Sequence, residues 1–303
     1  MSSNESLNQR LANGELLILD GATSTELQKR GVPMDEHTWS GTVAVTHPAE
    51  VRQLHHDYIE AGADVIIATT YSSSRHILDA AGLGERVREI NTQAIELAQQ
   101  ARDQAGKKPV WIAGSISLMA PDFTSAKRPS VAQIGSYFKE QADILTEAGA
   151  DLIALEMLRD VDYSRVAIEL ALSTGLPVWA GFSCQYDNNG DLVMASGVGE
   201  TPPFKDVLDE LLVPELSLVS VMHSEIDVTT DGLKLVREKW DDPLGVYPNS
   251  GDIKPPNWIF ENIISPDEFA KHAKQWRDMG CQIIGGCCGL GPEHIQRLSD
   301  EFA

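Results

Sequence analysis

Two adjacent cysteines near the C-terminus carry the strongest chemical signal in the sequence. Cys287 and Cys288 lie in the phrase Gly285-Gly286-Cys287-Cys288-Gly289. Neighbouring side chains on an extended strand point to opposite faces, so both thiols can reach one point only if the chain turns there, and glycine permits such a turn. Thiolates are favoured ligands of Zn²⁺. We therefore expect a zinc site at this turn, in preference to two core cysteines or a vicinal disulfide.

A catalytic zinc ion needs a third protein ligand and an open position for a substrate. His223 and Cys184 are the two candidates, because each follows an expected strand and carries an atom that binds zinc. We take His223 as the third ligand and keep Cys184 as the alternative. The remaining cysteine, Cys281, stands at the start of the last expected strand, and we expect it to be part of the core.

The elements that must position these residues are short apolar runs that alternate with helical patterns. Nearly continuous apolar runs are typical of parallel strands covered on both faces. The expected strands are Leu16–Asp20, Asp64–Thr69, Pro109–Gly114, Asp151–Glu156, Pro177–Ser183, Leu216–Met222, Leu244–Tyr247 and Gln282–Gly285. Amphipathic helices are expected between them, among others at Pro48–Ala61, Gly84–Gln104 and Val131–Ala148. No glycine-rich phosphate loop follows a strand, which disfavours an open doubly wound sheet. The sequence therefore predicts an α/β fold, a single (β/α)8 TIM barrel in which residues 1–303 form one domain.

The active site of such a barrel lies at the C-terminal ends of its strands. Polar residues follow every expected strand, and they are Asp20, Thr70, Tyr71, Ser115, Glu156, Cys184, His223, Tyr247, Asn249, Cys287 and Cys288. Four long segments, expected to be irregular, lie at the same end, namely Gly31–Thr46, Met119–Ser130, Tyr186–Lys205 and Tyr247–Ser265. Thr70 or Ser115 alone would be an ordinary polar group of the barrel rim, but the set as a whole predicts an active site.

Composition and charge exclude several classes of protein. The formal net charge of −21 disfavours binding to nucleic acid or to an anionic lipid surface. Residues Met1–Arg10 lack the apolar core of a signal peptide, and no apolar run approaches the roughly 20 residues that span a bilayer. We expect a cytoplasmic enzyme with small-molecule substrates and no nucleic-acid or membrane partner. In a reducing compartment its four cysteines favour metal binding over disulfides. Nothing in the sequence indicates an oligomeric state.

Several phrases resemble the homocysteine S-methyltransferase family, whose members include enzymes that use S-methylmethionine or betaine as the methyl donor. The resemblance runs from Leu16 to Leu298. Its phrases are Leu19-Asp20-Gly21-Ala22-Thr23-Ser24-Thr25-Glu26-Leu27, Trp39-Ser40, Ala61-Gly62-Ala63-Asp64, Glu156, Tyr247-Pro248-Asn249-Ser250-Gly251 and Gly285-Gly286-Cys287-Cys288-Gly289. The last two phrases together are the most specific.

The resemblance implies a zinc ion held by three cysteines, with homocysteine as the added ligand and methionine as the product. It implies that Asp20 and Glu156 bind the homocysteine ammonium, and that backbone N–H groups near Gly21 and Ala22 bind its carboxylate. We expect Asn249, which lies in one of the two most specific phrases, to be a further substrate-binding residue.

The resemblance also implies a pocket for a cationic methyl donor. In the branch that uses betaine, aromatic residues matching Trp39 and Tyr71 line this pocket. Aromatic faces attract a sulfonium or a quaternary ammonium. We therefore expect Trp39 and Tyr71 to contact the donor.

The sequence departs from the family pattern at two places. The sixth expected strand of the family ends in Gly-(Val/Ile)-Asn-Cys, but here the phrase is Ser220-Val221-Met222-His223. Either His223 replaces a thiolate ligand or the site differs more deeply. The family phrase Gly-Ser-(Val/Ile)-Gly-Pro after the third strand reads Gly114-Ser115-Ile116-Ser117-Leu118, which bears on the shape of the donor pocket.

A histidine ligand changes the charge of the metal site. Two thiolates and a neutral imidazole leave a Zn²⁺ site neutral, one unit less negative than three thiolates. The metal then binds the homocysteine thiolate at lower pH, but a less basic thiolate is a weaker nucleophile. We therefore hypothesise a more activated donor, a sulfonium in preference to betaine.

Two other functions remain open at this stage. The same site could methylate another thiol, or exchange methyl groups with a separate corrinoid protein. The sequence shows no corrinoid-binding module, which counts modestly against the corrinoid alternative. The chain could also be a non-catalytic zinc protein in which His223 marks a lost site.

Overall fold

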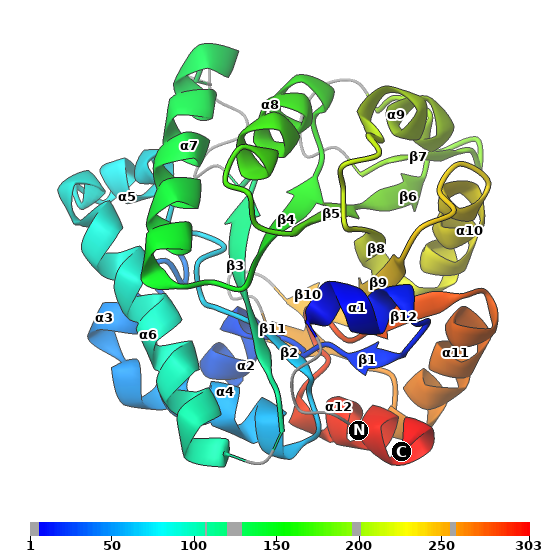
Figure 1. Cartoon of the computed structure of the whole chain (residues 1–303), viewed down its shortest axis with the longest axis horizontal. Coiled ribbons are helices and arrows are strands. Elements are labelled where there is room, and N and C mark those ends of the chain that lie inside the picture. The colour runs from blue at the N-terminus through cyan, green and yellow to red at the C-terminus, as the bar shows by residue number, and fades with distance from the viewer. Residues whose placement is uncertain (1–5, 107, 120–128, 196–200, 255–258) are drawn as a thin grey trace.

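The computed structural model describes residues 6–106, 108–119, 129–195, 201–254 and 259–303, and Figure 1 shows the arrangement of the elements. Eight parallel strands form one sheet in the order β1-β12-β9-β8-β5-β4-β3-β2. They are β1 (Leu17–Ile18), β2 (Val65–Ile67), β3 (Trp111–Ser117), β4 (Leu152–Leu158), β5 (Val178–Phe182), β8 (Leu218–Glu225), β9 (Leu244–Asn249) and β12 (Cys281–Ile284). Each of the eight expected strands corresponds to one of them.

The first and last strands of this order meet and close the sheet into a barrel. Just beyond β1, Leu19 forms a parallel bridge with Val65. On either side of it, Asp64 N donates to Ile18 O at 2.7 Å and Asp20 N donates to Val65 O at 2.9 Å. The (β/α)8 fold expected from the sequence is confirmed.

Helices surround the sheet on its outer side (Figure 1). The longer ones are α4 (Pro48–Glu60), α6 (Val87–Ala105), α7 (Val131–Ala148), α8 (Val161–Leu172), α9 (Phe204–Leu211), α10 (Ile226–Arg237), α11 (Pro266–Asp278) and α12 (Pro292–Phe302), and the shorter ones are α2 (Ser24–Lys29), α3 (Val43–Thr46), α5 (Arg75–Ala80) and the 3-10 turn η1 (Gly84–Arg86). The three expected helices are confirmed to within a few residues, because their apolar faces pack on the sheet. Within the described ranges, no helix combines the length and the apolar character needed to cross a bilayer.

A short N-terminal helix, α1 (Leu7–Ala12), seals one end of the barrel. Leu7 and Leu11 are buried, and they belong to the same apolar cluster as Leu17, Leu152 and Leu218, which are the first residues of β1, β4 and β8. Since this plug closes the N-terminal ends of the strands, the opposite end is the one that is left for a binding site.

Two of the segments expected to be irregular contain strands instead. β6 (Cys184–Tyr186) pairs with β7 (Leu192–Met194), and β10 (Asp252–Lys254) pairs with β11 (Ile259–Glu261), both antiparallel. Strands of three residues are too short to produce a recognisable alternation of apolar and polar residues. Most of the segment Met119–Ser130 lies outside the described residues.

Candidate active site

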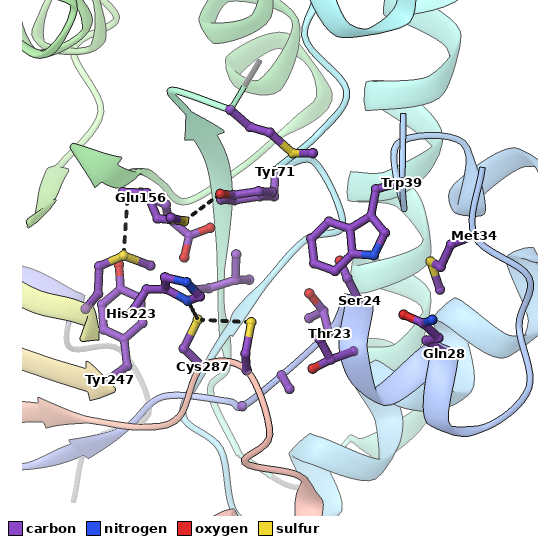
Figure 2. A pocket seen from close by; sticks show the side chains of 18 of the residues that line it. Thr23, Ser24, Gln28, Met34, Trp39, Tyr71, Glu156, His223, Tyr247 and Cys287 are labelled. Atoms are coloured by element: carbon purple, nitrogen blue, oxygen red, sulfur yellow. Dashed lines mark hydrogen bonds between the residues drawn. The ribbon is translucent and has the colours of Figure 1, made fainter. Parts of the chain in front are cut away.

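A cavity of about 660 Å³ opens at the C-terminal end of the barrel. Figure 2 shows the side chains that line it. Of the residues predicted from the sequence, the cavity wall includes Gly21, Ala22, Trp39, Tyr71, Glu156, His223, Tyr247, Cys287 and Cys288. Residues far apart in the chain thus meet at one place, as expected for the ends of parallel strands.

His223, Cys287 and Cys288 form a compact group of metal-binding atoms. His223 Nδ1 lies 3.4 Å from Cys287 Sγ, which lies 4.0 Å from Cys288 Sγ, and all three ligand atoms lie within 4.8 Å of one another. With Zn–S bonds of about 2.3 Å and Zn–N bonds of about 2.1 Å, a tetrahedral site has S···S and N···S edges of about 3.8 Å and about 3.6 Å. The three residues therefore fit a tetrahedral metal ion with one position left open.

The electrostatics of the two thiols also favour a cation. The neighbouring Cys288 sulfur and burial raise the pKa of Cys287 well above its usual range. Two adjacent thiolates would repel each other in this half-buried place, and a metal ion offsets that repulsion.

An irregularity in β8 turns His223 toward the cysteines. The pairing of β8 with β9 shifts register between Met222 and Glu225. His223 lies within this shift with a φ of 42°, a conformation that costs a non-glycine residue roughly 1–3 kcal/mol. A bulge re-aims a side chain at the end of a strand, and in Figure 2 the imidazole points to Cys287.

Cys184 and Cys281 lie outside the cluster. Cys184 is buried in β6, where its thiol accepts a hydrogen bond from Ser224 Oγ at 3.7 Å, and burial raises its pKa to about 12. It does not line the cavity. Cys281 belongs to the hydrophobic core, as expected. The geometry thus groups His223, and not Cys184, with the paired cysteines.

Glu156 is a buried acid on the cavity wall. Burial raises its pKa to about 7, although a hydrogen bond from Ser115 Oγ and the charge of His223 oppose that rise. Ser115 is itself fixed by Thr70, whose Oγ1 donates to Ser115 O at 2.8 Å and accepts from Ser115 N at 2.9 Å. The residue after Glu156, Met157, has a φ of 53° in a second register shift, between Leu155 and Leu158. Bulges therefore position both Glu156 and His223.

Asp20 lies beneath the wall instead of on it. It is fully buried, and Oδ2 accepts a hydrogen bond from Ile67 N at 2.8 Å. Within the described part of the chain, Oδ1 has no hydrogen-bond partner. Burial raises the pKa of Asp20 well above its usual value, and the charge of Glu156 raises it further. Two buried acids within electrostatic reach of each other favour the arrival of a small cation, which would allow both to ionise.

The aromatic residues expected to hold a donor form a pair. Trp39 and Tyr71 meet edge to face, with ring centroids 6.2 Å apart and an interplanar angle of 83°. Tyr71 OH donates to Met157 Sδ at 2.6 Å. In Figure 2 the two rings lie across the cavity from Cys287. Ring faces, which carry the negative part of the aromatic quadrupole, can attract a cation in this cavity.

Two predicted substrate contacts are already engaged within the protein. Ala22 N donates to Leu290 O at 2.9 Å, so this backbone group cannot also bind a carboxylate, although Ala22 still lines the cavity. Asn249 Nδ2 donates to Glu225 Oε1 at 2.7 Å, and Asn249 does not line the cavity. Its place at the end of β9 suits a role in holding the end of β8.

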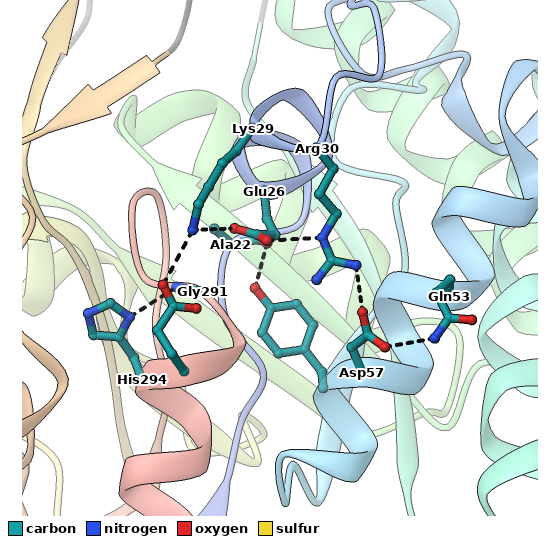
Figure 3. A network of polar contacts seen from close by, with 10 residues as sticks. Ala22, Glu26, Lys29, Arg30, Gln53, Asp57, Gly291 and His294 are labelled. Atoms are coloured by element: carbon teal, nitrogen blue, oxygen red, sulfur yellow. Dashed lines mark hydrogen bonds and ion pairs between the residues drawn. The ribbon is translucent and has the colours of Figure 1, made fainter.

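The wall formed by α2 is anchored by ion pairs (Figure 3). Glu26 Oε1 accepts from Arg30 Nε at 3.0 Å, and Arg30 reaches Asp57 of α4 at 2.6 Å. Lys29 Nζ lies 3.3 Å from Glu293 of α12. These contacts tie α2 to two outer helices and so fix one side of the cavity.

Several lining residues escaped the sequence reasoning. Met157, Arg159 and Met222 face the cavity, together with Thr23, Ser24, Thr25 and Gln28 of the segment at α2. Apolar methionines at strand ends are indistinguishable from core residues in a sequence, and an arginine after a strand has the pattern of a solvated charge. The nearest signal was the position of Arg159 three residues beyond Glu156.

Comparisons with known proteins identify the family of this chain. The sequence model of the homocysteine S-methyltransferase family matches residues 17–302. The homocysteine S-methyltransferase of Escherichia coli is 28% identical over 98% of this chain and 99% of its own length.

Solved structures of the homocysteine methyltransferase MmuM from Escherichia coli have the same fold. The oxidized form matches with a TM-score of 0.81 and 28% identity, over 98% of this chain and 99% of its own. A metallated form matches with a TM-score of 0.76 and 28% identity, over 94% and 96% of the two chains. The chain therefore belongs to the homocysteine S-methyltransferase family of enzymes.

Proposed function

We propose that this enzyme transfers a methyl group from a small sulfonium donor to the thiolate of homocysteine, with zinc held by His223, Cys287 and Cys288. The observation that carries the proposal is the group of three ligand atoms within 4.8 Å of one another, on the wall of a cavity of about 660 Å³. A relative of 28% identity whose structure has a metallated form supports the presence of a metal. Zinc is the metal that this set of sulfur and nitrogen ligands suits best.

Zinc, when bound, supplies the positive charge that keeps a thiol ionised at neutral pH. The protein's own residues then fix the rest of homocysteine. Glu156 and Asp20 would hold the ammonium, since burial raises the pKa of both acids and the charge of Glu156 raises that of Asp20 further. Because Ala22 N is occupied, we assign the carboxylate to the backbone around Gly21.

The donor binds against Trp39 and Tyr71, whose rings favour a sulfonium. A bond forms between the homocysteine sulfur and the methyl carbon while the bond from that carbon to the donor sulfur breaks. The electron pair of the broken bond stays on the donor sulfur, so the donor leaves as a neutral thioether and methionine is formed. No proton moves in this step, and the rate depends mainly on holding the three atoms in line.

The replacement of a thiolate by His223 favours a sulfonium over betaine. A site with two thiolates and an imidazole gives a less basic, weaker homocysteine nucleophile. A sulfonium compensates because its leaving group is a neutral thioether, which departs more readily than an amine.

The test uses protein purified under reducing conditions, with its metal content measured first. Homocysteine is incubated with methyl-labelled S-methylmethionine or betaine, and labelled methionine is quantified. We expect one zinc ion per chain and faster transfer from the sulfonium. A higher kcat/KM for betaine would refute the donor assignment. Protein that is active without any bound metal would refute the proposed role of zinc.

The same preparation separates the rival functions. Methyl transfer that appears only with an added methyl-corrinoid protein, or only with another thiol, would replace our assignment of substrates. Cobalt(II) substituted for zinc gives a visible spectrum that responds to a new sulfur ligand. A cobalt spectrum that homocysteine leaves unchanged would favour a non-catalytic metal protein.

A further inference from the structure

Arg159 is an unexpected cation on the cavity wall. Among the described residues that line the cavity, it is the only lysine or arginine. It follows β4, three positions beyond Glu156 and just past the bulge at Met157. Its Nε donates to Ala195 O at 2.8 Å. The guanidinium is thus held in place beside the space that the substrates must occupy.

The charge of Arg159 acts on the aromatic side of the cavity. Burial lowers its pKa, but a guanidinium remains protonated at neutral pH. Its charge in turn favours ionisation of the Tyr71 hydroxyl. Arg159 therefore lines the same cavity as Tyr71 and lies within electrostatic reach of that ring.

This arrangement conflicts with a donor that carries only positive charge. A fixed guanidinium in a half-buried cavity repels a second cation, and water screens that repulsion less there than at the surface. A carboxylate on the same donor molecule removes the conflict, since it can accept two parallel hydrogen bonds from the guanidinium. A donor with both charges would place its sulfonium on the aromatic rings and its carboxylate on Arg159.

We propose that Arg159 binds the carboxylate of the methyl donor, and so selects zwitterionic donors that carry both an onium centre and a carboxylate over donors that carry an onium centre alone. This inference rests on the proposed methyl transfer. The donor, and not homocysteine, is the partner because Arg159 acts on Tyr71, whereas the proposed homocysteine ammonium site lies at Glu156 and Asp20. Arg159 is then a specificity-determining residue that takes no part in bond making or breaking.

The test compares two donors that differ only in charge, S-methylmethionine and its isosteric carboxamide. For Arg159→Gln, kcat/KM for S-methylmethionine should fall roughly 10- to 100-fold, as for loss of a charge-assisted hydrogen bond. For the carboxamide it should stay the same or rise, because the repulsion is gone. Arg159→Lys should retain part of the preference. The matched control is Arg165→Gln on α8, whose side chain is 48% exposed and pairs with Asp162, and it should behave as wild type with both donors.

Opposite effects on the two donors cannot come from a general loss of structure. Equal losses of kcat/KM for both donors would overturn the proposal, and so would a rise in KM for homocysteine alone. If Arg159→Gln does not fold, the test uses the wild-type enzyme. Equal kcat/KM values for S-methylmethionine and its carboxamide would then also overturn the proposal.

The proposed function can fail separately. If wild-type protein transfers no methyl group from either donor, calorimetric titration with each compound still tests Arg159. Tighter binding of S-methylmethionine than of the carboxamide, lost in Arg159→Gln, supports the carboxylate site, and equal binding refutes it.

Discussion

At position 223 this chain has an imidazole where the family pattern has a thiolate. Whether His223 acts as a metal ligand depends on its distance from the two cysteines. His223 Nδ1 lies 3.4 Å from Cys287 Sγ, so removal of any member of the cluster should cost a ligand. Cys287→Ala, Cys288→Ala and His223→Ala should each lower zinc content from one ion per chain to a small fraction, measured by atomic emission. Cys184→Ala is the control and should keep its metal. Zinc lost from Cys184→Ala but kept in His223→Ala would contradict the assignment.

Substituting cysteine at this position should change the choice of donor. His223→Cys restores three thiolates, which makes the metal site more negative and the bound homocysteine thiolate more nucleophilic. We expect the ratio of kcat/KM for betaine to kcat/KM for S-methylmethionine to rise. Zinc content should stay at one ion per chain, and an unchanged or smaller ratio with full zinc would argue against the link between ligand charge and donor.

At this scale the sequence predicted residue types better than contacts. Cys287, Cys288 and His223 were identifiable because thiols and imidazoles at strand ends are uncommon without a role. The hydrogen bond from Ala22 N to Leu290 O could not be predicted, because it depends on how two segments that are distant in the sequence pack together. Arg159 was missed for a similar reason, since a charge beside a cavity and a charge in water have the same sequence pattern.

Among the elements, the bulges in β4 and β8 determine how the side chains of the site are oriented. Both strands were predictable from their apolar runs, but a register shift of one residue leaves no mark in such a run. The expected strand Leu216–Met222 was therefore too short, since β8 continues to Glu225. The hairpins β6–β7 and β10–β11 were missed because their pairing is local and brief.

The helix α4 contains a buried histidine that makes stability depend on pH. His55 is fully buried, neither ring nitrogen has a hydrogen-bond partner within the described residues, and burial lowers its pKa from 6.5 to about 4. A depressed pKa means that the unfolded chain takes up the proton first, so the stability that neutral His55 contributes is present above about pH 6.5 and is lost as the pH falls toward about 4.

Replacing this histidine should flatten that dependence. Between about pH 6.5 and about pH 4, His55→Leu should lose less unfolding free energy than wild type, by up to about 3 kcal/mol. Urea unfolding at several pH values measures the difference. His56→Leu, on the same helix but partly exposed, should keep the wild-type slope because His55 is intact. Equal slopes for His55→Leu and wild type would refute the argument.

The plug α1 should stabilise the barrel without touching the chemistry. Leu11 is 2% exposed inside the barrel cluster, so Leu11→Ala should lower the free energy of unfolding by about 2–5 kcal/mol. Zinc content of the folded protein should not change, since the cluster lies at the opposite end of the strands. Asn8→Ala, on the exposed side of α1, should change stability by less than about 0.5 kcal/mol. An equal effect of the two variants would mean that α1 does not act as a plug.

The whole molecule divides its barrel between stability and function. The N-terminal strand ends are packed with leucines, whereas the C-terminal ends hold the polar cavity. This division was predictable from the sequence because parallel strands place all their C-terminal residues on one side. The size of the cavity and the distribution of polar residues on its wall could not be predicted from the sequence. Both depend on segments that are far apart in the chain and come together only in the folded protein.

The net charge of the whole molecule determines how added salt changes its stability. The chain has 45 acidic and 24 basic residues. Even if every basic side chain were paired with an acid, 21 negative charges would remain in excess. Salt weakens both the exposed ion pairs and this repulsion, but exposed pairs contribute little individually, so relief of repulsion should dominate.

Raising sodium chloride from about 0.1 M to about 1 M shortens the screening length from about 10 Å to about 3 Å. The melting temperature should then rise, by about 1–2 °C for each kcal/mol of repulsion relieved in a chain of this length. Potassium chloride at equal ionic strength is the control and should give the same rise, because screening does not depend on the identity of a monovalent cation. A melting temperature that falls in both salts would show that ion pairs such as Arg30–Asp57, at 2.6 Å, contribute more to the stability of the barrel than the excess negative charge takes away.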